Sequence, residues 1–223
     1  MTAPVDVVIA AWNAERFVAQ AIASALEQTV MPANIIVVDD GSTDGTAAVA
    51  RSVDPRVTVI EREHEGVGHT RNHGIAATTS DHVAFLDADD LWLPRKLECQ
   101  LAARRDDPSI GAVFCLVDEF YDERHGPVVG ARQARVGAQA ALSSGALITR
   151  DALEQIGPFA RSDAGDWLAW WARARSLGVK EHYVQEVLVR RRIHGNNSSM
   201  SDPSSNTFFA VLRDHLRDRP RQQ

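Results

Sequence analysis

The stretch His82-Val83-Ala84-Phe85-Leu86-Asp87-Ala88-Asp89-Asp90 joins a run of apolar residues directly to closely spaced carboxylates. The apolar run predicts a buried strand, which would place the aspartates at the mouth of a sheet. Hard cations prefer carboxylate and phosphate oxygens, so this strand end suits Mg²⁺ or Mn²⁺ holding a diphosphate. An isolated Asp-x-Asp is more often a solvated turn. The segments upstream decide between these two interpretations.

The first half of the chain alternates strand-like and helix-like segments. Buried strands are predicted at residues 5–10, 35–38, 57–60 and 82–86, with helices after Asn13, at 47–50 and within 66–77. Asn13 is expected to cap the first of these helices. Because helical crossovers favour parallel pairing, we expect an α/β fold with an open, mostly parallel sheet flanked by helices.

Polar residues follow three of the predicted strands at the points where the strands end. Trp12-Asn13 follow the first strand, Asp39-Asp40 the second and Asp87 to Asp90 the fourth. In open parallel sheets, ligands bind beyond the carboxyl ends of the strands. Three strand ends that bring polar groups to one edge favour a ligand site over a solvated turn.

The second half is less regular. Its patterns predict a helix through Leu97 and Leu101, strands at 110–120, 147–148 and 183–189, and a helix at 152–156 that ends at Gly157-Pro158. A further helix carries Trp167, Trp170 and Trp171; at least one is expected in the core, because three exposed Trp side chains would promote aggregation. Polar loops are predicted at 121–138 and 195–205, and a terminal helix at 208–216.

Composition narrows the function classes. The 223 residues carry a formal charge of −6, which gives the chain no general attraction to nucleic acid. Cys99 and Cys115 form no metal-ligand or Cys-x-x-Cys spacing, and we expect reduced, mostly buried thiols. The sequence shows neither a signal peptide nor an apolar run of the ~20 residues that a membrane helix needs. We therefore expect a cytoplasmic protein, which must be recruited if it acts at a membrane surface; the sequence does not indicate an oligomeric state.

The segments, taken together and in order, resemble the family 2 glycosyltransferases with the GT-A fold, from about Val5 to Ser199. Two segments depart slightly from the family pattern: Ala10 and Trp12 stand where Pro and Tyr are usual, and Thr70 replaces Ala. The matching segments are Val7 to Asn13, Val37 to Thr46, Arg71-Asn72 with Gly74, Phe85 to Asp90, Gly165-Asp166-Trp167, and Arg192-Ile193-His194 with Asn197 and Ser199.

The resemblance implies transfer of a sugar, with inversion, from a nucleotide diphosphate donor, usually UDP-linked, to an acceptor hydroxyl. It implies one domain over residues 1–223, in which 1–104 bind the nucleotide sugar, 105–200 bind the acceptor and 201–223 form a C-terminal loop and helix. A divalent ion, Mn²⁺ or Mg²⁺, would stabilise the charge that grows on the departing diphosphate.

The resemblance assigns the metal to three residues. Asp89 is the first choice for direct ligation, and Asp87 is assigned to the ribose and to the metal, directly or through water. His194 would ligate the metal or contact the diphosphate, although a lone histidine is more often structural. Ala88 counts among the donor-contacting positions, and Asp90 is expected as a supporting or capping residue.

The nucleotide is assigned to residues that follow the first two strands. Asp40 is expected to accept from the uracil N–H, with Asp39 as its rival; both could instead serve only in a turn. Ala11 and Trp12 would lie beside the base, with the core as the alternative place for Trp12. Arg71 would pair with the diphosphate, brace Asp40 or Asp87, or remain a surface charge.

Asp166 is the candidate general base, with Asp163 as the alternative and a helix N-cap as the structural interpretation. Gly165 stands where Glu is usual in the family. Trp167 is expected near the acceptor, and Trp170 or Trp171 in the core. One competing hypothesis is a nucleotide-sugar-binding protein without transfer activity, which the loss of Glu favours. A nucleotidyltransferase ranks lower, because residues 10–14 lack the Gly-rich first loop of those enzymes.

Overall fold

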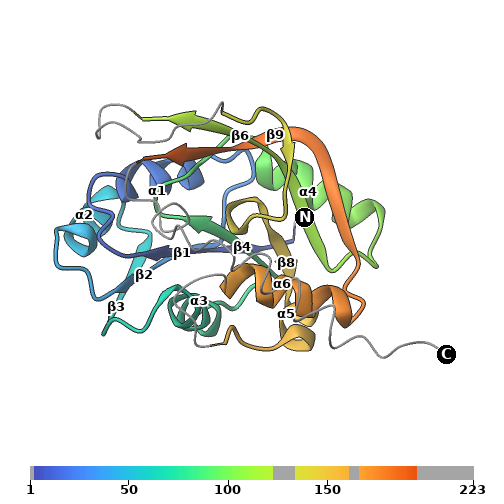
Figure 1. Cartoon of the computed structure of the whole chain (residues 1–223), viewed down its shortest axis with the longest axis horizontal. Coiled ribbons are helices and arrows are strands. Elements are labelled where there is room, and N and C mark those ends of the chain that lie inside the picture. The colour runs from blue at the N-terminus through green and yellow to red at the C-terminus, as the bar shows by residue number, and fades with distance from the viewer. Residues whose placement is uncertain (1–2, 123–133, 161–165, 195–223) are drawn as a thin grey trace.

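The fold is a curled sheet covered by helices on both faces (Figure 1). The structure, a computed structural model, describes residues 3–122, 134–160 and 166–194. Their strands run in the order β3-β2-β1-β4-β8-β6-β9-β5, with β7 beside β6. The sheet is continuous through both halves of the chain.

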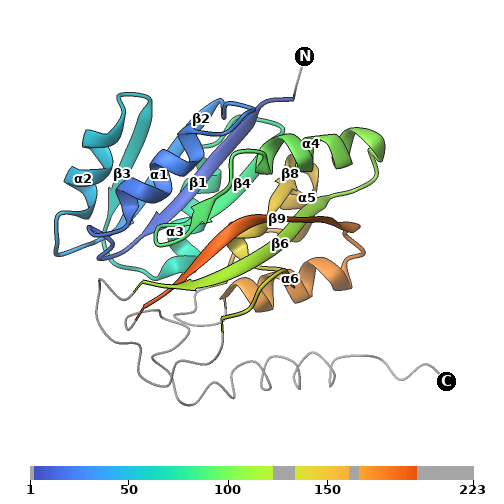
Figure 2. The same ribbon diagram turned by 90° about the horizontal axis from the view of Figure 1, so that it is seen from above.

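The first four strands are parallel, as predicted. They are β1 (Val5–Ala11), β2 (Asn34–Asp40), β3 (Val57–Arg62) and β4 (His82–Asp87), and they lie side by side in Figure 2. The helices α1 (Val18–Leu26), α2 (Thr46–Val53) and α3 (Val67–Ala76) connect them. The apolar runs and turn residues therefore predicted each of these strands to within a few residues.

The second half adds antiparallel pairs. Strand β8 (Leu147–Thr149) is antiparallel to both β4 and β6 (Ala112–Tyr121), whereas β6 and β9 (Glu181–Ile193) are parallel. The remaining elements are β5 (Leu91–Trp92), α4 (Lys96–Asp106), β7 (Ala138–Gln139), the 3₁₀ turn η2 (Ser143–Gly145), α5 (Arg150–Ile156) and α6 (Asp166–Ser176). The α/β class with a sheet flanked by helices is confirmed; antiparallel pairs enter only with strands of the second half, whose longest pair, β6 with β9, is parallel.

The two faces of the sheet carry separate hydrophobic clusters. Val7 and Ile9 of β1 pack with apolar residues of α1, α2 and α4, whereas Val8 packs with those of α3, α5 and α6. Figure 1 shows α1 and α4 on one side of the sheet and α3, α5 and α6 on the other. Burial on both faces explains why the strands read as continuous apolar runs.

One local prediction was wrong, and two short strands were missed. Asn13 does not cap α1: its backbone has φ 48°, its side-chain oxygen accepts the Thr43 N–H at 2.9 Å, and the helix begins only at Val18. The side chain joins the turns that follow β1 and β2 instead, a tertiary contact that outweighs the local capping signal. Strands β5 and β7 were missed, because two residues are too short to show a period, and the first residue of β7 falls in the predicted polar loop at 121–138.

Several sequence-based predictions lie outside the described residues. They are most of the loop at 121–138, the loop after His194 and the terminal helix at 208–216. In the part of the chain that the structure describes, no helix is long and apolar enough to cross a membrane. The division into a donor half and an acceptor half stays a prediction.

Candidate functional site

The carboxyl ends of β1, β2 and β4 bring most of the predicted site residues to one edge. In the sheet register, Ala10 pairs with Asp87 on one side and Val38 on the other, and Ala11 pairs with Asp39. Asp39 therefore lies one residue further along the sheet than Asp87, with β1 between their two strands. The aspartates share one edge because consecutive parallel strands end together.

Asp87 is held by three hydrogen bonds from distant segments. Arg71 donates to Oδ1 at 2.9 Å, Ser143 Oγ donates to Oδ2 at 2.7 Å, and the Asp87 N–H donates to Ser144 Oγ at 3.1 Å. Arg71 is buried, and its guanidinium lies 5.7 Å from the ring centroid of Trp167. Of the roles considered for Arg71, the structure supports bracing Asp87, and the surface-charge alternative is wrong.

Asp89 and His194 meet across the fold. His194 Nε2 lies 3.0 Å from Asp89 Oδ2, and the imidazole stacks on Phe17 with ring centroids 4.6 Å apart. Arg192 Nε donates to the Asp89 carbonyl at 2.9 Å, so β9 holds both the loop after β4 and the histidine. These contacts join residues that the sequence analysis assigned to one metal from opposite ends of the chain.

Asp90 is a buried supporting carboxyl. It accepts from Ser144 Oγ at 2.6 Å and from the Arg192 N–H at 3.0 Å. Burial raises the pKa of Asp90 well above its ordinary value, and the negative charges of Asp89 and Asp87 add to this effect. Ala88 is also buried. The raised pKa favours the neutral form of the Asp90 carboxyl, so Asp90 supports the loop through its hydrogen bonds and leaves the negative charge to its neighbours.

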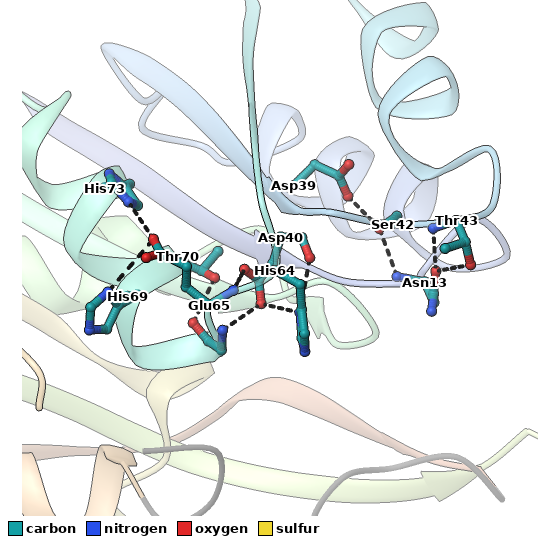
Figure 3. Close-up of polar contacts among 11 residues, drawn as sticks. Asn13, Asp39, Asp40, Ser42, Thr43, His64, Glu65, His69, Thr70 and His73 are labelled. Atoms are coloured by element: carbon teal, nitrogen blue, oxygen red, sulfur yellow. Dashed lines mark hydrogen bonds and ion pairs between the residues drawn. The ribbon is translucent and has the colours of Figure 1, made fainter. Parts of the chain in front are cut away.

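Asp40 and Asp39 are both buried, with 3% of each residue exposed. Figure 3 shows Asp40 as the centre of a cluster in which its Oδ1 accepts the Glu65 N–H at 2.9 Å and its Oδ2 accepts the Gly66 N–H at 3.0 Å. Asp39 accepts from Ser42 Oγ within the turn that follows β2. Asp39 thus bonds a side chain of its own turn, whereas Asp40 holds the backbone of the distant segment Glu65-Gly66.

Trp12 lies on the surface beside this cluster. It is 54% exposed and stacks on His64, with ring centroids 4.7 Å apart and planes 20° apart. The alternative that Trp12 belongs to the core is therefore wrong, whereas its neighbour Ala11 is buried. The sequence analysis did not single out His64, because its partners Asp40 and Trp12 are distant in the sequence and no local motif marks the contact.

Helix α6 begins at Asp166, the candidate base. The side chain of Asp166 and the whole of Asp163, the alternative base, lie outside the part of the chain that the structure describes. Trp167, Trp170 and Trp171 are all buried. Trp167 nevertheless adjoins the site, because its ring lies against Arg71, which holds Asp87. Among the described residues, no three His, Cys, Asp or Glu side chains form a preassembled metal site.

Residues 6–157 match the glycosyl transferase family 2. The chain belongs to this family. It is 31% identical to an uncharacterized glycosyltransferase of Nostoc sp. over 90% of the chain and 68% of that relative. The prediction of a family 2 glycosyltransferase, made from the order of the motifs, is confirmed.

Two further comparisons place this family 2 chain. The UDP-Glc:alpha-D-GlcNAc-diphosphoundecaprenol beta-1,3-glucosyltransferase WfaP of Escherichia coli is 27% identical over 94% of the chain and 83% of WfaP. The crystal structure of Staphylococcus aureus TarS residues 1–349 in complex with UDP-GlcNAc superposes with a TM-score of 0.77 at 18% identity, over 96% of this chain and 66% of that structure. The likeness to TarS confirms the GT-A fold. The chain spans about two thirds of the length of the Nostoc relative and of TarS 1–349.

Proposed function

We propose that this chain transfers a sugar, with inversion, from a UDP-linked donor to an acceptor hydroxyl, with Mn²⁺ or Mg²⁺ at the diphosphate. The observation that carries the proposal is the meeting of Asp89 Oδ2 and His194 Nε2, 3.0 Å apart. They meet at the sheet edge where Asp87 lies, together with Trp12 and Asp40, the residues assigned to the nucleotide.

The side-chain atoms that meet here are suitable ligands for a divalent cation. Asp89 supplies a carboxylate oxygen and His194 an imidazole nitrogen, and Asp87 lies two residues from Asp89 at the end of β4. Carboxylates suit Mg²⁺ and Mn²⁺, and an imidazole favours Mn²⁺ over Mg²⁺. Few protein ligands leave coordination positions for the oxygens of a diphosphate. When bound, the ion would supply charge stabilisation for the departing diphosphate.

The protein side chains would orient the donor and move the proton. Trp12 offers a stacking surface for the base, and Ala11 offers backbone beside it. Arg71 and Ser143 hold the Asp87 carboxylate in place, and Asp87 would bond the ribose of the donor. Asp166 would take the proton of the acceptor hydroxyl from the opposite face of the sugar, with Asp163 as the alternative.

The acceptor is best sought among lipid-linked glycans first. The E. coli relative WfaP, by its name, uses UDP-Glc and a sugar on diphosphoundecaprenol. We therefore propose a nucleotide-sugar donor and a glycan acceptor as partners, and action in the cytoplasm or at the membrane surface facing it. A transfer assay with radiolabelled UDP-sugars and a panel of lipid-linked, oligosaccharide and peptide acceptors tests this assignment.

A nucleotide-sugar-binding protein without transfer activity is the second candidate. Gly165 favours it, because a carboxylate usual in the family is missing next to Asp166. The two candidates differ in turnover: metal-dependent UDP binding without transfer or donor hydrolysis over the whole acceptor panel would support the binding protein. The family assignment speaks against the third hypothesis, a nucleotidyltransferase.

A thermal-shift measurement tests the metal site. At a ligand concentration of about 100 times Kd, binding adds about 2.7 kcal/mol to the free energy of unfolding, or roughly 5–10 °C for a chain of this size. UDP with Mn²⁺ should raise the Tm of the wild type by this amount, and UDP alone should not. Asp89→Ala should abolish the metal-dependent shift, whereas Asp106→Ala, with 77% of its side chain exposed, should keep it. An equal shift in Asp89→Ala would remove Asp89 from the assignment.

A further inference from the structure

The polar group exposed at the nucleotide end of the site is a histidine rather than an aspartate. The Asp40 carboxylate is buried and accepts the N–H groups of Glu65 and Gly66. Its Oδ2 also lies 2.9 Å from His64 Nδ1. By contrast, 54% of the His64 side chain is exposed, against 5% for Asp40. A base that approaches this edge therefore meets the imidazole before it meets the carboxylate.

The contacts of Nδ1 fix the hydrogen-bonding character of the other ring nitrogen. Nδ1 faces two acceptors, Asp40 Oδ2 at 2.9 Å and the Asp40 carbonyl oxygen at 3.1 Å. Neither can donate, since one is a carboxylate and the other a backbone carbonyl, so Nδ1 must carry the hydrogen. In the neutral imidazole, Nε2 then has a free lone pair and accepts hydrogen bonds.

The position of the imidazole is set from two sides. Gly41, with φ 69°, lets the chain carrying His64 pass closely, because a Cβ at residue 41 would lie 2.8 Å from the His64 backbone nitrogen. On the other side, the ring stacks on Trp12, with the planes 20° apart. A base lying in the plane of the imidazole would therefore also lie nearly parallel to the Trp12 indole.

We propose that His64 recognises the nucleobase of the donor: Nε2 accepts the ring N–H of a uracil-type base while Trp12 offers its face to that base. Asp40 is then a positioning residue that fixes the tautomer and orientation of His64. This assignment rests on the proposed function and replaces direct contact between Asp40 and the uracil. It predicts selection for bases with a ring N–H at that edge, namely uracil, thymine and guanine, over adenine and cytosine.

The test compares UDP with N3-methyl-UDP by isothermal titration calorimetry in the presence of Mn²⁺. N3-methyl-UDP lacks the hydrogen that Nε2 would accept, so the wild type should bind it about tenfold more weakly, which corresponds to about 1.4 kcal/mol. His64→Asn keeps a donor near the Nδ1 position but has no atom near Nε2, and this variant should lose most of the preference for UDP. His64→Gln places an amide oxygen near the Nε2 position and should keep it.

A matched control uses a histidine of the same surface that does not contact Asp40 or Trp12. His69 is a residue of α3 and lies near Glu65 (Figure 3). His69→Asn should bind UDP, and discriminate against N3-methyl-UDP, as the wild type does. If His64→Asn still prefers UDP by the wild-type factor, or His64→Gln loses the preference, the recognition role of Nε2 is overturned. If the wild type binds UDP but does not discriminate against N3-methyl-UDP, the inference also fails while the proposed function stands. A wild type that binds neither nucleotide would remove both.

Discussion

Replacing Arg192 should destabilise the protein strongly, because this buried arginine ties three segments together. Only 1% of its side chain is exposed, and it forms an ion pair with Asp122, which is 3% exposed. Its Nη2 donates to Gln20 Oε1 at 2.8 Å and its Nε to the Asp89 carbonyl at 2.9 Å. In Arg192→Leu, the carboxylate of Asp122 stays buried without its arginine.

The size of the effect follows from this burial. Removing one partner of a buried ion pair costs about 3–5 kcal/mol, because the other charge is left in a poorly solvated place. For a chain of this size each kcal/mol lowers Tm by about 2–4 °C, so Arg192→Leu should lose roughly 6–20 °C. An exposed ion pair gives the matched control: Arg51 and Glu61 are about half exposed, and Arg51→Leu should cost less than about 1 kcal/mol.

Urea unfolding followed by Trp fluorescence measures both variants. The double variant Arg192→Leu/Asp122→Leu separates buried charge from lost packing, because it removes both ions and should recover most of the lost stability. It should not recover affinity for UDP with Mn²⁺, because the link from Arg192 to the Asp89 carbonyl is still missing. The reasoning is refuted if Arg192→Leu costs no more than Arg51→Leu, or if the double variant is less stable than the single one.

Three further variants test separate parts of the structure. Burial lowers the pKa of Lys96 to about 8, against about 10.4 in an unfolded chain. Between these two pH values the unfolded state binds more protons than the folded state, so the stability of the protein should rise with pH there. Lys96→Met should abolish this rise, measured as the urea midpoint at each pH. Burial alone would raise the pKa of Asp6, but hydrogen bonds from Ser80, Asn34 and Thr79 lower it overall. The ionised Asp6 therefore stabilises the fold above about pH 3.9, and this stabilisation is lost as the pH falls through the lowered pKa. Asp6→Asn should be less stable than the wild type at pH 7 and approach it in acid. Trp12→Ala should change stability by less than about 0.5 kcal/mol and weaken UDP binding by about 1–3 kcal/mol in calorimetry, and an unchanged Kd would exclude Trp12 from the base site.

The sequence was most informative where local patterns decide the structure. The β-branched run at 35–38 and the apolar run at 82–86 each exceed what a surface segment tolerates, so both were predicted as buried strands. Parallel pairing then brings Asp39, Asp40 and Asp87 to one edge without further information. That edge was therefore predictable from strand ends alone.

The partners of these carboxylates were not predictable in the same way. Ser144 bonds the Asp87 N–H from 57 residues away, and Arg192 reaches the Asp89 carbonyl across 103 residues. No local sequence pattern marks Ser144 or Arg192 for these roles, because the roles arise from the way η2 and β9 pack near the end of β4. His64 was missed for the same reason: its meaning depends on the close passage at Gly41 and on Trp12.

The most direct test of the central claim is the position of manganese in crystals grown with UDP and Mn²⁺, located by anomalous scattering. The account predicts one strong peak between Asp89 Oδ2 and His194 Nε2, about 2.1 Å from each ligand atom that it binds and in contact with the diphosphate. UDP seated at this edge without a metal peak, or a manganese ion bound away from Asp87 and Asp89, would contradict it.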